Sequence, residues 1–271
     1  MKTVGVWDSG VGGLSVLRAL LAELPEVRFV YVADSAFAPY GGRSAEVITE
    51  RALCLTDALL KKAPLDAMVV ACNTATAGAI DALRARHVNL SVVGVEPALK
   101  PAAQSSRTGH VGVLATRGTL VSRRYADLVS RTKAAFPNVH FSSQACEGLA
   151  DAIEQADQAQ VKRLCQKAWI DLNGQSPDRA PIDQLVLGCT HYPFARDELE
   201  QICGPQVHLI DPAEAVARQA RRVLNLPVAK PLTLPCPQPM VEWLDTGNTL
   251  ALARAARRWI DREAVVQVLP V

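Results

Sequence analysis

One cysteine lies where an apolar run stops and a helical pattern begins. Residues 68–77 read MVVACNTATA, so Cys72 follows the apolar run and precedes Asn73 and Thr74. A helix N-terminus favours the thiolate form, because its free backbone N–H groups and its dipole stabilise negative charge. A lone cysteine is more often a small buried hydrophobe. The neighbouring amide and hydroxyl groups favour a functional role for Cys72.

A second cysteine repeats this arrangement further along the chain. Residues 185–194 read LVLGCTHYPF, in which Cys189 precedes Thr190 and His191. A histidine two positions from a cysteine could tune the thiol or act as the acid that protonates a substrate group. A zinc site would need further ligands at suitable spacing, and the sequence offers none. A papain-like Cys/His hydrolase would explain one cysteine turn but not two.

Alternating strand and helix patterns would position these cysteines. Such alternation predicts βαβ units and a parallel sheet. Open parallel sheets bind ligands at the carboxyl-terminal ends of their strands, where we expect both cysteines. The predicted strands are 3–7, 27–33, 66–71, 91–95, 110–114, 138–143, 184–188 and 206–210, and helical patterns include 14–24, 45–62, 212–224 and a basic-faced 251–260.

The motif pattern looks duplicated, which favours two lobes over a single TIM barrel. An Asp-Ser-Gly turn at 8–10 precedes the Cys72 turn, and an Ala-Thr-Arg-Gly turn at 115–118 precedes the Cys189 turn. We predict an α/β fold of two doubly wound parallel-sheet lobes related by pseudo-twofold symmetry, with the active site in the cleft between them. The predicted lobe A comprises 1–96 and 210–271, and the predicted lobe B comprises 97–209.

Composition and charge exclude several classes of protein. The 271 residues are 49% hydrophobic, and 29 basic residues nearly balance 27 acidic ones. This balance predicts neither a nucleic-acid nor an anionic-membrane partner. No apolar run approaches the roughly 20 residues of a membrane span. The start of the sequence lacks a signal-peptide pattern, and the seven cysteines lack C-x-x-C spacing, so we expect free thiols in a reducing cytoplasm.

The turn DSGVGG at 8–13 joins the first predicted strand to the first helix. Dinucleotide binding is a rival interpretation, because Asp34 follows the second strand at about the expected distance. It fails because Ser15 replaces the third glycine and because Asp8 would lie beside a pyrophosphate. Asp8 suits a cationic group such as an α-ammonium. Helix capping is a credible alternative for Asp8 or Ser9, and less so for both.

Other residues could serve structure or function. The loop after the second strand contains Tyr40 and Gly41, and its glycines leave backbone N–H groups free to bind a carboxylate, although an ordinary turn would look the same. Thr116 and Thr119 could line the cleft or cap a helix. Arg221 and its neighbour at 222 are expected on a solvated helix face. Segment 231–240 is expected to be a proline-rich connector, and the cysteines at 54, 165 and 203 are expected to be fillers in helices.

The ordered motifs DSGVGG, PYGGRS, CNTAT and GCTHYP resemble those of the glutamate racemases, over Val4 to about Ala256 with a late TGN at 246–248. The wider superfamily includes aspartate racemases, which typically carry Glu where this chain has His191. The resemblance implies cofactor-free, metal-free, two-base racemisation of L-glutamate to D-glutamate for peptidoglycan synthesis, by a homodimer. Some relatives have an N-terminal extension linked to activation by a cell-wall precursor, which this chain, reaching Asp8 so early, is not expected to share.

The resemblance also implies roles for individual residues. Cys72 and Cys189 would be the two bases, with His191 assisting Cys189. Glu154, counted from Cys146, would lie near the second base, although Glu147 and Asp151 stand where relatives usually have proline. The implied substrate contacts are Asp8 and Ser9 for the amino group, Asn73, Thr74 and Thr190 for the α-carboxylate, and Tyr40 and Gly41 for the side-chain carboxylate.

Two other classes of function fit the same residues. One is a different proton-transfer enzyme of the same superfamily, such as an aspartate racemase, which a panel of substrates would distinguish. A two-lobed amino-acid binding protein would bind glutamate without exchanging its α-proton. The cysteine turns carry no adjacent lysine for pyridoxal phosphate, which favours proton transfer by the thiols themselves.

Overall fold

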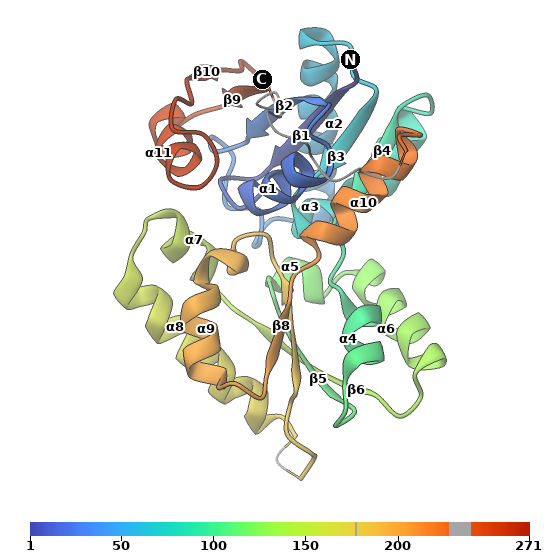
Figure 1. Cartoon of the computed structure of the whole chain (residues 1–271), viewed down its shortest axis with the longest axis vertical. Coiled ribbons are helices and arrows are strands. Elements are labelled where there is room, and N and C mark those ends of the chain that lie inside the picture. Colours follow the sequence, from blue (N-terminus) through green and yellow to red (C-terminus); the bar gives the residue numbers. More distant parts are fainter. Residues whose placement is uncertain (177, 228–239) are drawn as a thin grey trace. The chain divides into compact units, whose positions relative to one another are not determined.

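The structure, a computed structural model, describes residues 1–176, 178–227 and 240–271 (Figure 1). These residues form two compact units, one of Met1–Val95 with Ala213–Val271 and one of Glu96–Pro212. The sequence predicted the divisions after 96 and before 210. Most of the predicted connector 231–240, including Cys236, lies outside the described residues.

The first unit is built on a six-stranded parallel sheet with the order β10-β9-β2-β1-β3-β4. Every pairing in it is parallel. Its central strands carry almost continuous apolar sequence, as expected of strands covered on both faces. Its strands are β1 (Thr3–Asp8), β2 (Arg28–Ala33), β3 (Ala67–Val70), β4 (Ser91–Gly94), β9 (Val241–Asp245) and β10 (Val266–Val268).

The second unit is built on a four-stranded parallel sheet with the order β6-β5-β7-β8. Its strands are β5 (His110–Ala115), β6 (His140–Ala145), β7 (Gln184–Gly188) and β8 (His208–Ile210). The segment β2-β1-β3-β4 of the first sheet has the same order in sequence terms. In both sheets the first strand pairs with the second on one side and the third on the other, so the connection reverses there. Ligands of open α/β sheets bind at such reversal points.

Helices cover these sheets. In the first unit α1 (Leu14–Glu23) packs against α10 (Ala213–Val223), and α2 (Ala45–Lys62) packs against α3 (Asn73–Arg86). Helix α2 illustrates the local signals, since the Ser44 hydroxyl accepts the N–H of Val47 and two lysines lie in the last turn. The other helices are α11 (Thr249–Trp259) and, in the second unit, α4 (Leu99–Ser105), α5 (Arg117–Leu120), α6 (Arg123–Ala135), α7 (Leu149–Glu154), α8 (Gln158–Gly174), η1 (Tyr192–Ala195) and α9 (Arg196–Cys203).

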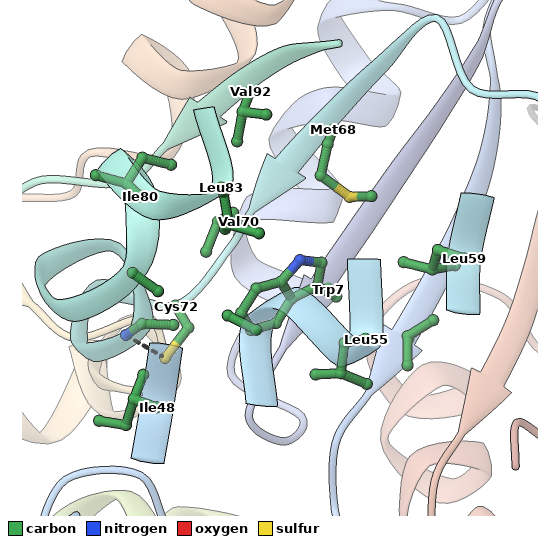
Figure 2. Close-up of a cluster of buried hydrophobic side chains, with 14 of the residues drawn as sticks. Trp7, Ile48, Leu55, Leu59, Met68, Val70, Cys72, Ile80, Leu83 and Val92 are labelled. Carbon is green, nitrogen blue, oxygen red and sulfur yellow. Dashed lines mark hydrogen bonds between the residues drawn. The ribbon is translucent and has the colours of Figure 1, made fainter. Parts of the chain in front are cut away.

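Apolar side chains fill the space between each sheet and its helices. In the first unit Trp7, Leu55 and Met68 belong to one buried cluster with Cys72 at its margin (Figure 2). Burying a side chain of this size contributes roughly 2 kcal/mol. The cluster therefore fixes the turn that carries Cys72 to the body of the unit.

The α/β fold and all eight predicted strands are confirmed, and the two separate sheets exclude a single barrel. Two strands were missed. β9 follows the proline-rich segment, and β10 is short and largely exposed, so neither shows a clear pattern. No helix in the described ranges is long and apolar enough to cross a membrane.

The expectation for Arg221 was wrong. Its side chain is 7% exposed and lies 2.9 Å from the carboxylates of both Glu23 and Glu26. The apolar part of an arginine side chain packs well when its guanidinium finds acidic partners. Only Arg222, the second residue of the pair, is exposed.

Candidate active site

Cys72 lies between β3 and α3. It has extended backbone geometry and is the N-cap of α3, and its Sγ accepts the backbone N–H of Ala75 at 3.5 Å (dashed in Figure 2). The helix runs for 14 residues, so its free N–H groups and dipole favour negative charge at this position. The predicted strand, turn and helix N-terminus are confirmed, and the thiol is 5% exposed.

The end of β1 and the turn after it carry two buried polar side chains, of which Ser9 lies beside this thiol. The Sγ of Cys72 and the Oγ of Ser9 are 3.6 Å apart, so the carboxyl ends of β3 and β1 meet at the reversal point of the sheet. Asp8 is fully buried, and its Oδ2 accepts the N–H groups of Gly10 and Gly13 at 3.0 Å each. A Cβ at Gly13 would lie 2.6 Å from that of Asp8, so glycine is needed there. Asp8 thus organises the turn and adds a buried carboxylate beside Ser9.

Asn73 and Thr74 form the first turn of α3 and are both buried. The Nδ2 of Asn73 donates to the carbonyl of Val95 at 3.4 Å. Its Oδ1 is buried without a hydrogen-bond partner among the described residues. A buried amide oxygen without a partner is unusual, because it forfeits its hydration. This oxygen can accept a hydrogen bond from a bound ligand.

Cys189 begins the turn after β7 and is joined to an acid–base chain. Its Sγ lies 3.7 Å from the Nδ1 of His191, and the Nε2 of His191 lies 2.8 Å from the Oε1 of Glu154. Glu154 ends α7, so two elements of the second unit bring the three groups together. His191 is 5% exposed, whereas the Glu154 side chain is 30% exposed. The carboxylate orients the imidazole and stabilises its protonated form.

Two opposing effects set the pKa of His191. Burial lowers it, but the hydrogen bonds and charges of Cys189 and Glu154 raise it, and the pKa lies well above its ordinary value. His191 therefore remains a cation over a wider pH range than a free imidazole. A cationic imidazole favours the thiolate of its cysteine partner.

Cys146, another buried cysteine of the second unit, has a different environment from Cys189. Burial raises the pKa of the Cys146 thiol to about 12. The carbonyl of Cys146 accepts the hydroxyl of the fully buried Tyr192 at 3.4 Å. Cys146 therefore stays a neutral thiol near pH 7. Thr190, the residue after Cys189 in the chain, is also buried.

The loop after β2 carries Tyr40 and Gly41. The Tyr40 side chain is buried, and its hydroxyl donates to Asp34 at 2.7 Å. Burial and the Asp34 charge raise its pKa, so the phenol stays protonated. The phenol of Tyr40 is therefore engaged by Asp34. Sequence reasoning missed Arg51 of α2, which also pairs with Asp34, because no motif or spacing marks it.

Thr116 caps a helix, which was one of its two predicted roles. Its hydroxyl caps α5 by accepting the N–H of Thr119 at 3.2 Å, and the two hydroxyls are 2.9 Å apart. Among the predicted site residues, the structure thus brings together three groups by side-chain contact: Thr116 with Thr119, Cys72 with Ser9, and Cys189 with His191 and Glu154.

The sequence matches a protein-family model described as Asp/Glu/Hydantoin racemase over residues 9–220. This chain belongs to that racemase family. The racemase is 46% identical over 224 residues to a glutamate racemase of Pseudomonas aeruginosa, a match that covers 82% of this chain and 81% of the relative. It is 41% identical over 255 residues to a glutamate racemase of Herpetosiphon aurantiacus, covering 93% and 96%.

Solved structures give the same result. A glutamate racemase of Escherichia coli, in complex with L-glutamate and the activator UDP-MurNAc-ala, matches with a TM-score of 0.81 and 30% identity, over 100% of this chain and 98% of that one. One of Bacillus anthracis matches with a TM-score of 0.80 and 31% identity, over 100% and 97%. The resemblance to glutamate racemases seen in the motifs is thus confirmed for this racemase.

Proposed function

We propose that the protein interconverts L- and D-glutamate by proton transfer at Cα, with Cys72 and Cys189 as its two acid–base groups. The observation that carries the proposal is that each thiol follows the third strand of its unit, at equivalent places in the four-strand order that the two sheets share, beside groups that stabilise a thiolate. The curated relatives are glutamate racemases. Solved relatives hold L-glutamate in E. coli and D-glutamate in Francisella tularensis.

Inversion at Cα requires that hydrogen leave one face and return to the other. A single monoprotic base would return the proton to the face from which it came. In the proposed mechanism one cysteine abstracts the proton as a thiolate while the other donates one as a thiol on the opposite face. The reverse reaction exchanges their roles, so each direction needs one thiolate and one thiol.

Different groups assist the two cysteine bases. The Ala75 N–H and the start of α3 stabilise the Cys72 thiolate. The His191 imidazole, itself held by Glu154, serves Cys189. Cys189 can pass its proton to His191 or take it back, and the net charge of the cysteine–histidine pair stays the same in both forms. This arrangement limits the number of negative charges beside a substrate that carries two carboxylates.

The remaining predicted contacts bind three different groups of the substrate. Asp8 and Ser9 would bind the α-ammonium group, since a buried carboxylate favours a cation. Asn73, Thr74 and Thr190 would hold the α-carboxylate, on which charge develops when the proton leaves. The backbone N–H groups of the Tyr40–Gly41 turn would bind the side-chain carboxylate. The D-glutamate produced would supply peptidoglycan synthesis.

A substrate panel tests this function. Purified protein without added cofactor is incubated with L-glutamate, D-glutamate, L-aspartate and D-aspartate, and the enantiomers are separated by chiral chromatography. We expect each glutamate enantiomer to approach an equal mixture and aspartate to react at least about 100-fold more slowly, because one missing methylene misplaces its carboxylate. Faster aspartate racemisation would contradict the proposed substrate, and binding of glutamate without inversion would contradict racemisation.

A further inference from the structure

A buried carboxylate joins the loop after β2 to the loop after β9. Asp34 immediately follows β2 and has no exposed surface. Its carboxylate accepts the hydroxyls of Tyr40 and Thr246 at 2.7 Å each. Arg51 of α2 adds a bidentate ion pair with N–O distances of 2.8 and 2.6 Å. Asp34 is thus held by protein donors on several sides and anchors the loop.

The turn after β9 also holds the backbone of this loop. The Thr246 hydroxyl, which donates to Asp34, accepts the N–H of Ala36 at 3.2 Å. The N–H of Asn248 donates to the Ser35 hydroxyl at 2.7 Å, and that hydroxyl donates to Asp245. Side-chain and backbone contacts therefore fix the start of the loop that carries Tyr40 and Gly41.

Gly247 shows how closely the two loops approach. A Cβ at this position would lie 2.9 Å from the backbone nitrogen and 3.0 Å from the Cα of Ala36. Backbone atoms cannot rotate away as the end of a flexible side chain can. Any larger residue at 247 must therefore displace the loop after β2.

We propose that Thr246, acting through Asp34, is a positioning residue that fixes the Tyr40–Gly41 turn for binding the substrate's side-chain carboxylate. This inference rests on the proposed function for the identity of the substrate. Backbone N–H groups donate in fixed directions, so their alignment with a carboxylate depends on the position of the turn. Thr246 and Tyr40 share one carboxylate, so a change at Thr246 reaches the turn directly.

Steady-state kinetics of Thr246→Val and Gly247→Ala test the proposal. The valine keeps the shape of threonine but removes the hydroxyl, and the alanine displaces the loop by contact. We expect KM for glutamate to rise about tenfold, as for loss of one hydrogen bond to a charged group, while kcat changes by less than about twofold. Thr246→Ser should restore KM, because it restores the hydroxyl.

Glu242→Gln is the matched control. Glu242 lies near the start of the same strand β9, where it pairs with Arg28 at 2.7 Å and Lys62 at 3.2 Å. We expect its KM to equal that of the wild type. A merely structural role of Thr246 would lower the folded fraction, and so apparent kcat, at unchanged KM. That result, or an equal rise of KM in Glu242→Gln, would overturn the proposal.

Thermal unfolding of every variant shows how much of each sample is folded, and Gly247→Ala tests the loop even if Thr246→Val folds poorly. Failure of the proposed function has a different signature. Wild-type protein would then fail to turn over glutamate before any variant is compared. Wild-type activity with unchanged KM in both Thr246→Val and Gly247→Ala would overturn the positioning role alone.

Discussion

At the residue scale, the two thiols differ in the groups that lie beside them. Cys72 depends on a helix N-terminus and has a hydroxyl neighbour, Ser9. Cys189 depends on a titratable partner, His191. Substitutions at His191 and Glu154 should therefore change proton transfer at one thiol and leave the other thiol's surroundings intact.

We expect His191→Ala to lower kcat/KM for glutamate about 100-fold, the lower range for a proton-transfer group. Glu154→Gln should lower it about tenfold, because one charge-assisted hydrogen bond is weakened. L- and D-glutamate have equal free energies, so kcat/KM must fall by the same factor in both directions. Unchanged rates in His191→Ala, measured in both directions, would contradict its role.

The raised pKa of His191 also predicts how stability depends on pH. The folded protein holds this proton more tightly than the unfolded chain does, so the stabilisation is complete below about pH 6.5 and is lost as pH rises through the folded pKa. Glu154→Gln should destabilise the protein by about 1 kcal/mol near pH 6, a value kept small because the carboxylate is partly exposed. Urea unfolding at a series of pH values measures this difference, which should shrink at higher pH. A difference that grows with pH would contradict the assignment.

At the element scale, a buried arginine joins two helices of the first unit. Arg221 of α10 binds the side chain and the carbonyl of Glu23, at the end of α1, and also Glu26. The two helices are far apart in sequence, and their pairing brings the last part of the chain against the first. The sequence showed only a basic pair, because the partners of Arg221 lie almost 200 residues away.

Arg221→Leu should lower the free energy of unfolding by about 1–3 kcal/mol, because it leaves two carboxylates without their cation. The control is Arg222→Leu, one position along the same helix and exposed, which should change stability by less than about 0.5 kcal/mol. Urea unfolding measures both variants. Equal effects would show that the buried ion pair contributes nothing specific.

At the scale of the whole molecule, each unit presents a cysteine after its third strand in the chain, and the β2-β1-β3-β4 segment of the six-stranded sheet shares the order of the four-stranded sheet. The sequence predicted the strands, the two lobes and the cysteine turns but not the strand order, because apolar runs and turns are local signals that a single chain displays. The motif resemblance placed Glu154 near the second base, but no local pattern predicts that its carboxylate reaches His191 across 37 positions, or that Thr246 reaches Asp34 across 212. Such contacts depend on how elements pack, and neither residue differs locally from an ordinary helix end or turn.

Solvent exchange with the single-cysteine variants tests the two-base mechanism most directly. Cys72→Ala and Cys189→Ala are each incubated with L- and D-glutamate in D2O, and the α-proton signal is followed by NMR alongside chiral analysis. We expect both variants to remain folded and neither to invert glutamate, whereas the wild type exchanges the α-proton and forms the opposite enantiomer. A variant that retains one base can exchange the α-proton of one enantiomer without inverting it. Racemisation at the wild-type rate by either variant would contradict the requirement for two thiols.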